Sequence, residues 1–242
     1  KLLKQYREAD RPEDVGKCLL TIANHFIMLE DYENALPLYK EAYQLALEHK
    51  SIELQQVSGI MLIKYLCGAG YYSESLEYYN KIKPEIAFNP SMQNEVVKSY
   101  MELNKPDSAR IYLAARLLSE RGDKIVLNCM MAETYIPEGQ EDSVFVFLDR
   151  AMKSYKEKAK NYQKQGREAI LPNCFLSPCY LFADLLWKKG KIQQASQYYM
   201  IVEPLMKERV KTPVRMELQI KALTNFSSFC RETKQYEKAL DL

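Results

Sequence analysis

Few residues in this chain of 242 have side chains suited to catalysis or metal binding. It has two histidines, His25 and His49, and six cysteines, of which only Cys174 and Cys179 are close in sequence. Zinc needs about four ligands, and neither histidine is near the cysteine pair, so we expect no metal site. A disulfide between the paired cysteines would depend on their geometry, and buried free thiols are the simpler interpretation.

The sequence also lacks the common motifs of catalytic sites. It contains no phosphate-binding GxxxxGK loop, no GxSxG nucleophile and no HExxH metal motif. Two histidines supply few general bases near neutral pH. We therefore expect a protein that is not an enzyme and that has no cofactor.

The composition favours an all-helical protein. Hydrophobic residues make up 47%, so a sizeable core can be buried, and there are only 8 glycines and 10 prolines. A net charge of +2 gives no polybasic signature, so we expect no direct contact with nucleic acid. No run of about 18 apolar residues occurs, so we expect no membrane span. Because the chain starts with Lys1 and stops inside a helical pattern, we expect a segment of a longer protein.

A helix–turn–helix pattern recurs along the chain. In its clearest copy, Ala23 and Ala35 are small enough to let two helices approach closely. Phe26 and Tyr39, on the same helices, are large enough to fill the space between neighbouring hairpins. No stretch alternates between apolar and polar residues for long, so strands are not expected.

These residues resemble the tetratricopeptide repeat, a 34-residue helical hairpin. Numbered from Gly16, the first copy matches the family at six positions: Ala23, Phe26, Tyr32, Ala35, Tyr39 and Ala42. The resemblance continues in register over residues 16–50, 56–89, 90–124, 125–167 and 176–210, with a truncated copy at 220–242. It implies an all-α fold, a right-handed α-α superhelix of stacked hairpins that forms a single array over residues 1–242.

The copies differ in length. The equivalent small residues of the second helices are 40, 34, 35, 51 and 44 positions apart: Ala35, Ser75, Ala109, Val144, Ala195 and Ala239. The largest insertion follows the fourth copy, where we expect residues 151–167 to extend the helix before a loop with two prolines. We expect Gly70, Gly139 and Gly190 at turns between paired helices, where the backbone must be permissive.

The resemblance also implies where a ligand binds. In the family, first helices line a concave groove, and their second, fifth, ninth and twelfth positions point into it. The binding candidates at such positions are Asn24, Lys64, Asn94, Lys98, Glu133, Tyr180, Asp184 and Trp187; further groove positions include Lys17, Leu20 and Val57. Asn side chains can hold a peptide backbone, and Trp is enriched at binding hot spots.

Several of these residues have a simpler interpretation. Trp187 could pack between repeats, and Lys64 and Lys98 could be ordinary surface charges. Glu133 and Asp184 could meet in the groove as a carboxylate pair, for which salt bridging is a simpler role than hydrolysis.

The chain is similar overall to the repeat regions of bacterial transcription regulators and sensor kinases. We therefore expect a segment that binds a protein or peptide in a bacterial signalling or transcription-regulatory protein. The alternative is a free-standing scaffold for complex assembly. An exposed end of the stack could form a homodimer. The resemblance favours a periplasmic sensor segment, whereas unpaired cysteines favour a reducing, cytoplasmic compartment, so the localisation stays open.

Overall fold

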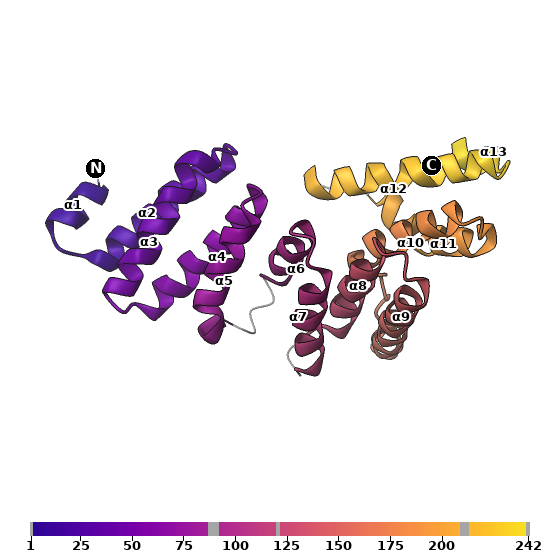
Figure 1. Cartoon of the computed structure of the whole chain (residues 1–242), viewed down its shortest axis with the longest axis horizontal. Helices are drawn as coiled ribbons and strands as arrows, with labels where there is room; N and C mark the ends of the chain where they lie inside the picture. The colour runs from indigo at the N-terminus through magenta and orange to yellow at the C-terminus, as the bar shows by residue number, and fades with distance from the viewer. Residues whose placement is uncertain (1, 87–91, 120–121, 209–212, 241–242) are drawn as a thin grey trace. The chain divides into compact units, whose positions relative to one another are not determined.

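The computed structural model describes residues 2–86, 92–119, 122–208 and 213–240. Within these residues the regular structure is entirely helical, which confirms the predicted all-α class (Figure 1). The first helices of the hairpins are α2 (Pro12–Met28), α4 (Ile52–Gly68), α6 (Gln93–Glu102), α8 (Lys124–Tyr135), α10 (Leu176–Lys188) and α12 (Pro213–Glu232). The second helices are α3 (Tyr32–Glu48), α5 (Tyr72–Ile86), α7 (Pro106–Leu118), α9 (Glu141–Lys164), α11 (Ile192–Lys207) and α13 (Tyr236–Leu240). The short helix α1 (Leu2–Glu8) precedes them, and a 3-10 turn, η2 (Asn173–Phe175), leads into α10.

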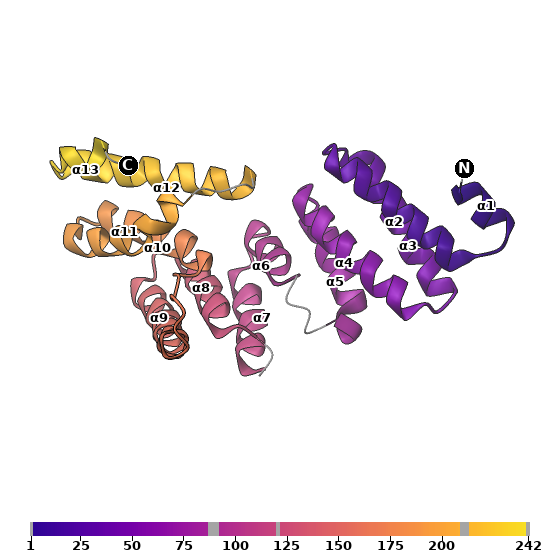
Figure 2. The same ribbon diagram turned by 180° about the vertical axis from the view of Figure 1, so that it is seen from behind.

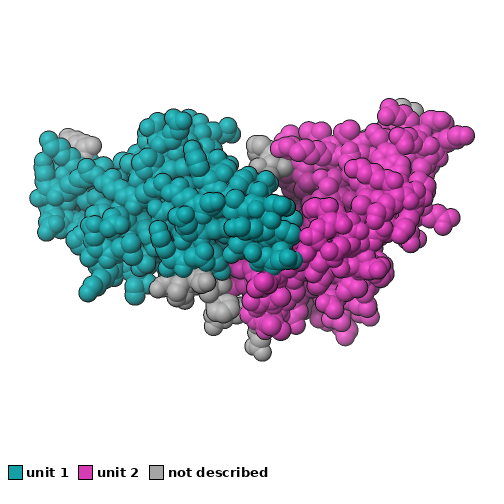
Figure 3. All heavy atoms as spheres, viewed as in Figure 1, with its two compact units in different colours: residues 1–109 teal, residues 110–242 magenta. Residues whose placement is uncertain are grey.

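The chain divides into two compact units, residues 1–109 and 110–242 (Figure 3). In the first unit, α2 packs on α3, α3 on α4 and α4 on α5, while the first helices α2, α4 and α6 contact one another in order. In the second unit, α8 packs on α9 and α10 on α11, and α8, α10 and α12 contact one another in order. This succession of neighbouring helices, also seen from behind (Figure 2), is the packing of tetratricopeptide-type hairpins within each unit.

All six hairpin turns in the described residues have the same backbone conformation. Each has one residue with φ between 53° and 85°, two positions before the second helix: Glu30, Gly70, Asn104, Gly139, Gly190 and Lys234. In the turn after α10, the Gly190 N–H bonds to the Trp187 carbonyl at 2.8 Å, and the Lys191 N–H bonds to the Leu186 carbonyl at 2.9 Å. This is the Schellman arrangement, which satisfies the last carbonyls of a helix. The three predicted glycine turns are confirmed, and three further turns use residues other than glycine.

Small side chains lie buried on both helices of a hairpin. Ala23 and Ala35 in the first hairpin are both fully buried, as are the equivalent alanines of α10 and α11. Where Ser75 replaces alanine, its hydroxyl donates to the Ile63 carbonyl at 2.9 Å and so ties α5 to α4. The packing is also tight at Gly59, where a Cβ atom would lie 2.6 Å from the side chain of Ile82.

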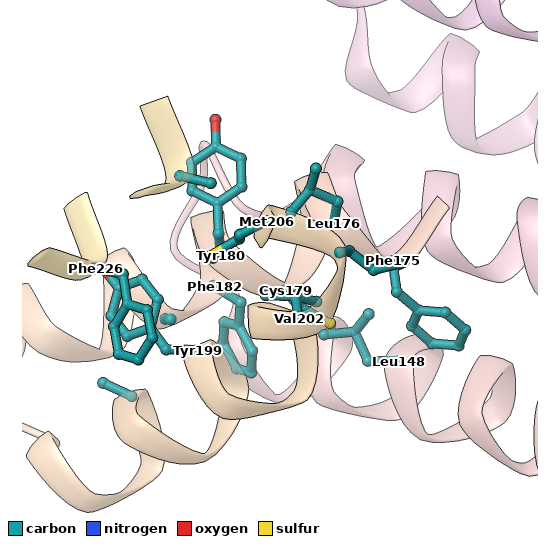
Figure 4. Close-up of a cluster of buried hydrophobic side chains, with 14 of the residues drawn as sticks. Leu148, Phe175, Leu176, Cys179, Tyr180, Phe182, Tyr199, Val202, Met206 and Phe226 are labelled. Carbon is teal, nitrogen blue, oxygen red and sulfur yellow. The ribbon is translucent and has the colours of Figure 1, made fainter. Parts of the chain in front are cut away.

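The core of the second unit gathers around α10. Figure 4 shows Phe182 and Cys179 of α10 beside residues of α9 and α11, and the Tyr199 ring lies against Phe226 of α12. These two rings are stacked with their centroids 4.7 Å apart. The predicted extension after the fourth copy is present as α9, a helix of 24 residues.

Candidate binding surfaces

Two predicted groove residues accept hydrogen bonds from inside their own hairpin. The Tyr39 hydroxyl donates to Asn24 Oδ1 at 2.6 Å, and the Tyr199 hydroxyl donates to a carboxylate oxygen of Asp184. In both pairs the tyrosine follows its acceptor by fifteen residues, and both tyrosines are fully buried. The side chains of Asn24 and Asp184 therefore stabilise the hairpin as well as facing outward from a first helix. This pairing was not predicted, although the constant separation of fifteen residues is visible in the sequence.

Asp184 also joins a third helix. The amide of Asn225 on α12 donates to its second carboxylate oxygen, so Asp184 connects α10, α11 and α12. Burial raises the pKa of Asp184, while the bonds from Tyr199 and Asn225 partly lower it again. Because both of its oxygens already accept hydrogen bonds, the carboxylate is held in one orientation.

Glu133 lacks the tyrosine partner. Leu148 stands fifteen residues after it, where the first and fifth copies have tyrosine, so no hydroxyl is available there. Glu133 is partly exposed as a residue, but protein atoms surround its carboxyl group densely. This burial raises its pKa to about 7, against a lowering effect of the hydrogen bond with Ser177. The carboxyl group is therefore partly protonated near neutral pH.

Glu133, Ser177, Tyr180 and Asp184 form one surface, here called the α8/α10 face. Tyr180 is buried along most of its length, yet its hydroxyl points away from the apolar cluster (Figure 4). Burial raises the pKa of Tyr180, and the nearby charges of Asp184 and Glu133 raise it further. The two carboxylates thus share Tyr180 as a neighbour, and burial is the main cause of the raised pKa of each.

In the first unit, Lys64 of α4 and Lys98 of α6 both approach Glu95, and these three residues are here called the α4/α6 face. Both lysines are exposed, and their charges partly offset the burial that raises the pKa of Glu95. One carboxylate oxygen of Glu95 is buried and has no hydrogen-bond partner among the described residues. The Lys64 ammonium lies 5.3 Å from the ring centre of Tyr65, and that of Lys98 lies 5.9 Å from the ring centre of Tyr72.

Glu95 was not predicted, because it is not at a groove position of the motif. Its spacing of three residues from Lys98 on a helix was the available signal. Asn94, the neighbouring predicted residue, is exposed, and its side chain makes no hydrogen bond within the described part of the chain. Trp187 is partly buried and meets Phe229 of α12 edge-on at 5.6 Å between ring centres. The structure therefore shows Trp187 in a packing contact, which was the simpler of its two interpretations.

Two clefts accompany these surfaces. One of about 200 Å³ lies between α2 and α4, and its lining includes the groove positions Lys17, Leu20 and Val57. The other, of about 330 Å³, lies among α9, α10 and α11, with Phe182 and Tyr198 in its wall. The first supports the predicted use of the first helices as a binding surface. The second was not predicted, because it depends on the packing of two second helices against α10.

Comparison with protein families adds one observation. Residues 176–200 match the tetratricopeptide repeat. They comprise α10 and the first part of α11, the hairpin that carries Tyr180 and Asp184. No curated protein matches the sequence. The match and the succession of helix hairpins together support a tetratricopeptide-type protein, a repeat fold that generally mediates protein–protein interaction and is generally not enzymatic.

The described residues contain no group of three or more His, Cys, Asp or Glu residues placed to hold a metal ion. No helix among them is both long enough and apolar enough to cross a membrane.

Proposed function

We propose that this chain is a non-catalytic segment that binds a protein or peptide along its first helices. The observation that carries the proposal is the α4/α6 face, where Lys64 and Lys98 are exposed on neighbouring first helices. The cleft between α2 and α4 supports it, because Leu20 and Val57 can accept an apolar side chain there. Ligand sites of this kind combine apolar pockets with a few well-placed polar groups.

The charges of the α4/α6 face favour an acidic ligand. Burial raises the pKa of Glu95, so its carboxyl group holds a proton to higher pH than an exposed one does. Two exposed lysines stand against this single carboxylate, so the three residues together carry a net positive charge at neutral pH. A ligand carboxylate placed near Lys64 and Lys98 would neutralise that charge, and the exposed amide of Asn94 can hold a peptide backbone.

The biological setting is part of the proposal. A segment of this type in a bacterial signalling or transcription-regulatory protein would sense a protein or peptide and pass the signal to an output domain. A free-standing scaffold would use the same surface to assemble a complex. Reading the gene on both sides distinguishes the two, because a stretch of about 20 apolar residues followed by a helix-turn-helix or kinase pattern supports the sensor.

The binding surface is tested by selecting peptides from a random library on the whole chain and measuring their Kd by fluorescence polarisation. Lys64→Ala and Lys98→Ala should each raise the Kd of acidic peptides about tenfold, because each removes one positive charge from the contact with the peptide. Lys81→Ala is the matched control, since Lys81 is an exposed lysine on the second helix α5 with its ammonium 5.0 Å from the Tyr78 ring centre. Equal weakening by all three variants, or by none, would place the ligand elsewhere.

A further inference from the structure

The second half of α9 extends beyond the packed part of the helix. All buried residues of α9 lie in its first half, so residues 152–164 contribute none. Tyr155 fixes the start of this extension, because its ring meets Phe175 edge-on at 6.1 Å between ring centres and its hydroxyl donates to the Ala169 carbonyl at 3.2 Å. A helical segment that buries little needs another source of stability, such as ion pairs or a partner.

Four lysines form a line along this extension, here called the α9 lysine stripe. Lys153, Lys156, Lys160 and Lys164 are all exposed. They are three or four positions apart, a spacing that places them on one face of a helix, and Tyr155 lies on the opposite side. The stripe is about 16 Å long, because an α-helix rises by about 1.5 Å per residue.

The charge of the stripe is poorly balanced within the chain. Lys153 pairs with Asp149 at 2.7 Å, whereas the other three lysines form no ion pair with any described residue. Like charges four positions apart repel each other along a helix. Residues 151–167 contain six basic residues and one acidic residue, a net charge of +5, while the whole chain has a net charge of +2. The remaining residues are therefore negative overall, and the positive charge of the chain is concentrated on this extension.

We propose that the α9 lysine stripe binds an acidic helix of a partner protein. Glutamates three or four positions apart on such a helix repeat along its axis at the same distance as the lysines do, so several ion pairs form in register. Binding removes the repulsion between neighbouring lysines. It also supports the part of α9 that buries little of its own surface.

Two other anionic partners fit the stripe less well. A membrane surface is less suitable because Glu157 and Gln163, the other residues on this face, are polar, so no apolar side chain is available to enter the lipid. Nucleic acid is less suitable because the rest of the chain is negative overall and repels the dense charge of the phosphates.

The test measures the Kd of a labelled synthetic peptide for the whole chain by fluorescence polarisation at low ionic strength. The probe is a helical peptide of alanine and glutamine with glutamates at its positions 1, 5, 9 and 12, which is the lysine spacing read in the opposite direction. A second peptide of the same composition, with its glutamates spread around the helix, should bind more weakly.

Matched variants of the chain locate the contact. Replacing three lysines together, Lys156→Gln, Lys160→Gln and Lys164→Gln, should raise the Kd of the probe about tenfold, because three exposed ion pairs are lost. The control set makes the same change in net charge at exposed lysines elsewhere, and the Kd should stay close to that of the unchanged chain: Lys50→Gln, Lys105→Gln and Lys234→Gln. Far-UV circular dichroism shows that both sets fold.

Two further measurements make the outcome decisive. A chain with Lys156→Glu, Lys160→Glu and Lys164→Glu should lose the glutamate probe and bind a peptide with lysines at the same four positions. Lys64→Ala, on the α4/α6 face of the first unit, should leave the Kd of the probe unchanged. Absence of binding, equal weakening by both glutamine sets, weakening by Lys64→Ala, or tighter binding of a short DNA duplex or of phosphatidylserine vesicles would overturn the proposal.

Discussion

Replacing Glu133 with glutamine should stabilise the protein above pH 7 and leave its stability near pH 4 unchanged. Burial raises the folded-state pKa of Glu133 to about 7 from an ordinary value of 4.5. Between these two values the folded state keeps a proton that the unfolded chain has released, so stability falls as pH rises. The favourable contribution is fully present below pH 4.5 and is lost as the pH passes about 7.

The expected size follows from the difference in pKa. Each pKa unit corresponds to about 1.4 kcal/mol, so a change from 4.5 to about 7 amounts to about 3 kcal/mol of unfolding free energy. Glutamine has nearly the same shape as the protonated side chain and carries no charge at any pH. Glu133→Gln should therefore gain about 3 kcal/mol at pH 8 and almost nothing at pH 4.

Urea unfolding followed by tryptophan fluorescence is the appropriate assay. Trp187 is the only tryptophan in the chain, and it lies in the same unit as Glu133, packed on Phe229. Its signal therefore reports the unfolding of that unit. Glu157→Gln is the matched control, because Glu157 is exposed on α9 of the same unit and should show no gain at either pH.

Two results would refute this reasoning. An equal gain at pH 4 and pH 8 would show that glutamine packs better than glutamate whatever the charge. No gain in unfolding free energy at pH 8 would show that the charged Glu133 carboxylate does not destabilise the folded state.

Two further predictions concern hydrogen bonding and packing. Tyr199→Phe should lower the unfolding free energy by about 1.5 to 3 kcal/mol at pH 7, because it removes a hydrogen-bond donor to the charged Asp184. Tyr39→Phe should lower it by only about 1 kcal/mol, because the acceptor of its hydrogen bond is a neutral amide. Equal losses in urea unfolding would contradict this prediction. Gly59→Ala should destabilise the first unit by about 1 to 3 kcal/mol through overpacking. Gly68→Ala, at the end of the same helix with its nearest neighbour at 3.5 Å, should be neutral or stabilising by up to about 1 kcal/mol, and thermal unfolding distinguishes the two.

Sequence patterns predicted the hairpins well because local rules determine them. Small residues mark where two helices cross, and glycine marks a turn that needs positive φ. The turns at Glu30, Asn104 and Lys234 were missed, because Glu and Lys rarely adopt positive φ and Asn, which adopts it more readily, also occurs in many other conformations. Their common position, two residues before the second helix, becomes evident only when the hairpins are compared.

The candidate surfaces were less predictable, because they depend on contacts between distant residues. The motif indicated Lys64 and Lys98, but it could not indicate that the charges of both act on Glu95. It also could not show that Asp184 accepts a hydrogen bond from a residue of α12. The single array over residues 1–242 and the ligand-binding role of each groove residue stay predictions.

The regular turns have a consequence for how this chain can change in evolution. In every hairpin the positive-φ residue precedes the small residue of the second helix by five positions, as Gly190 precedes Ala195. The distances between successive hairpins vary from 34 to 51 residues, as measured between those small residues. Insertions and deletions thus fall outside the turns, in the lengths of the helices, as in the 24 residues of α9, and in the junctions between hairpins. A junction such as residues 165–172 is the place to graft a reporter peptide or a new loop, and one residue added inside a turn would rotate the whole second helix out of register.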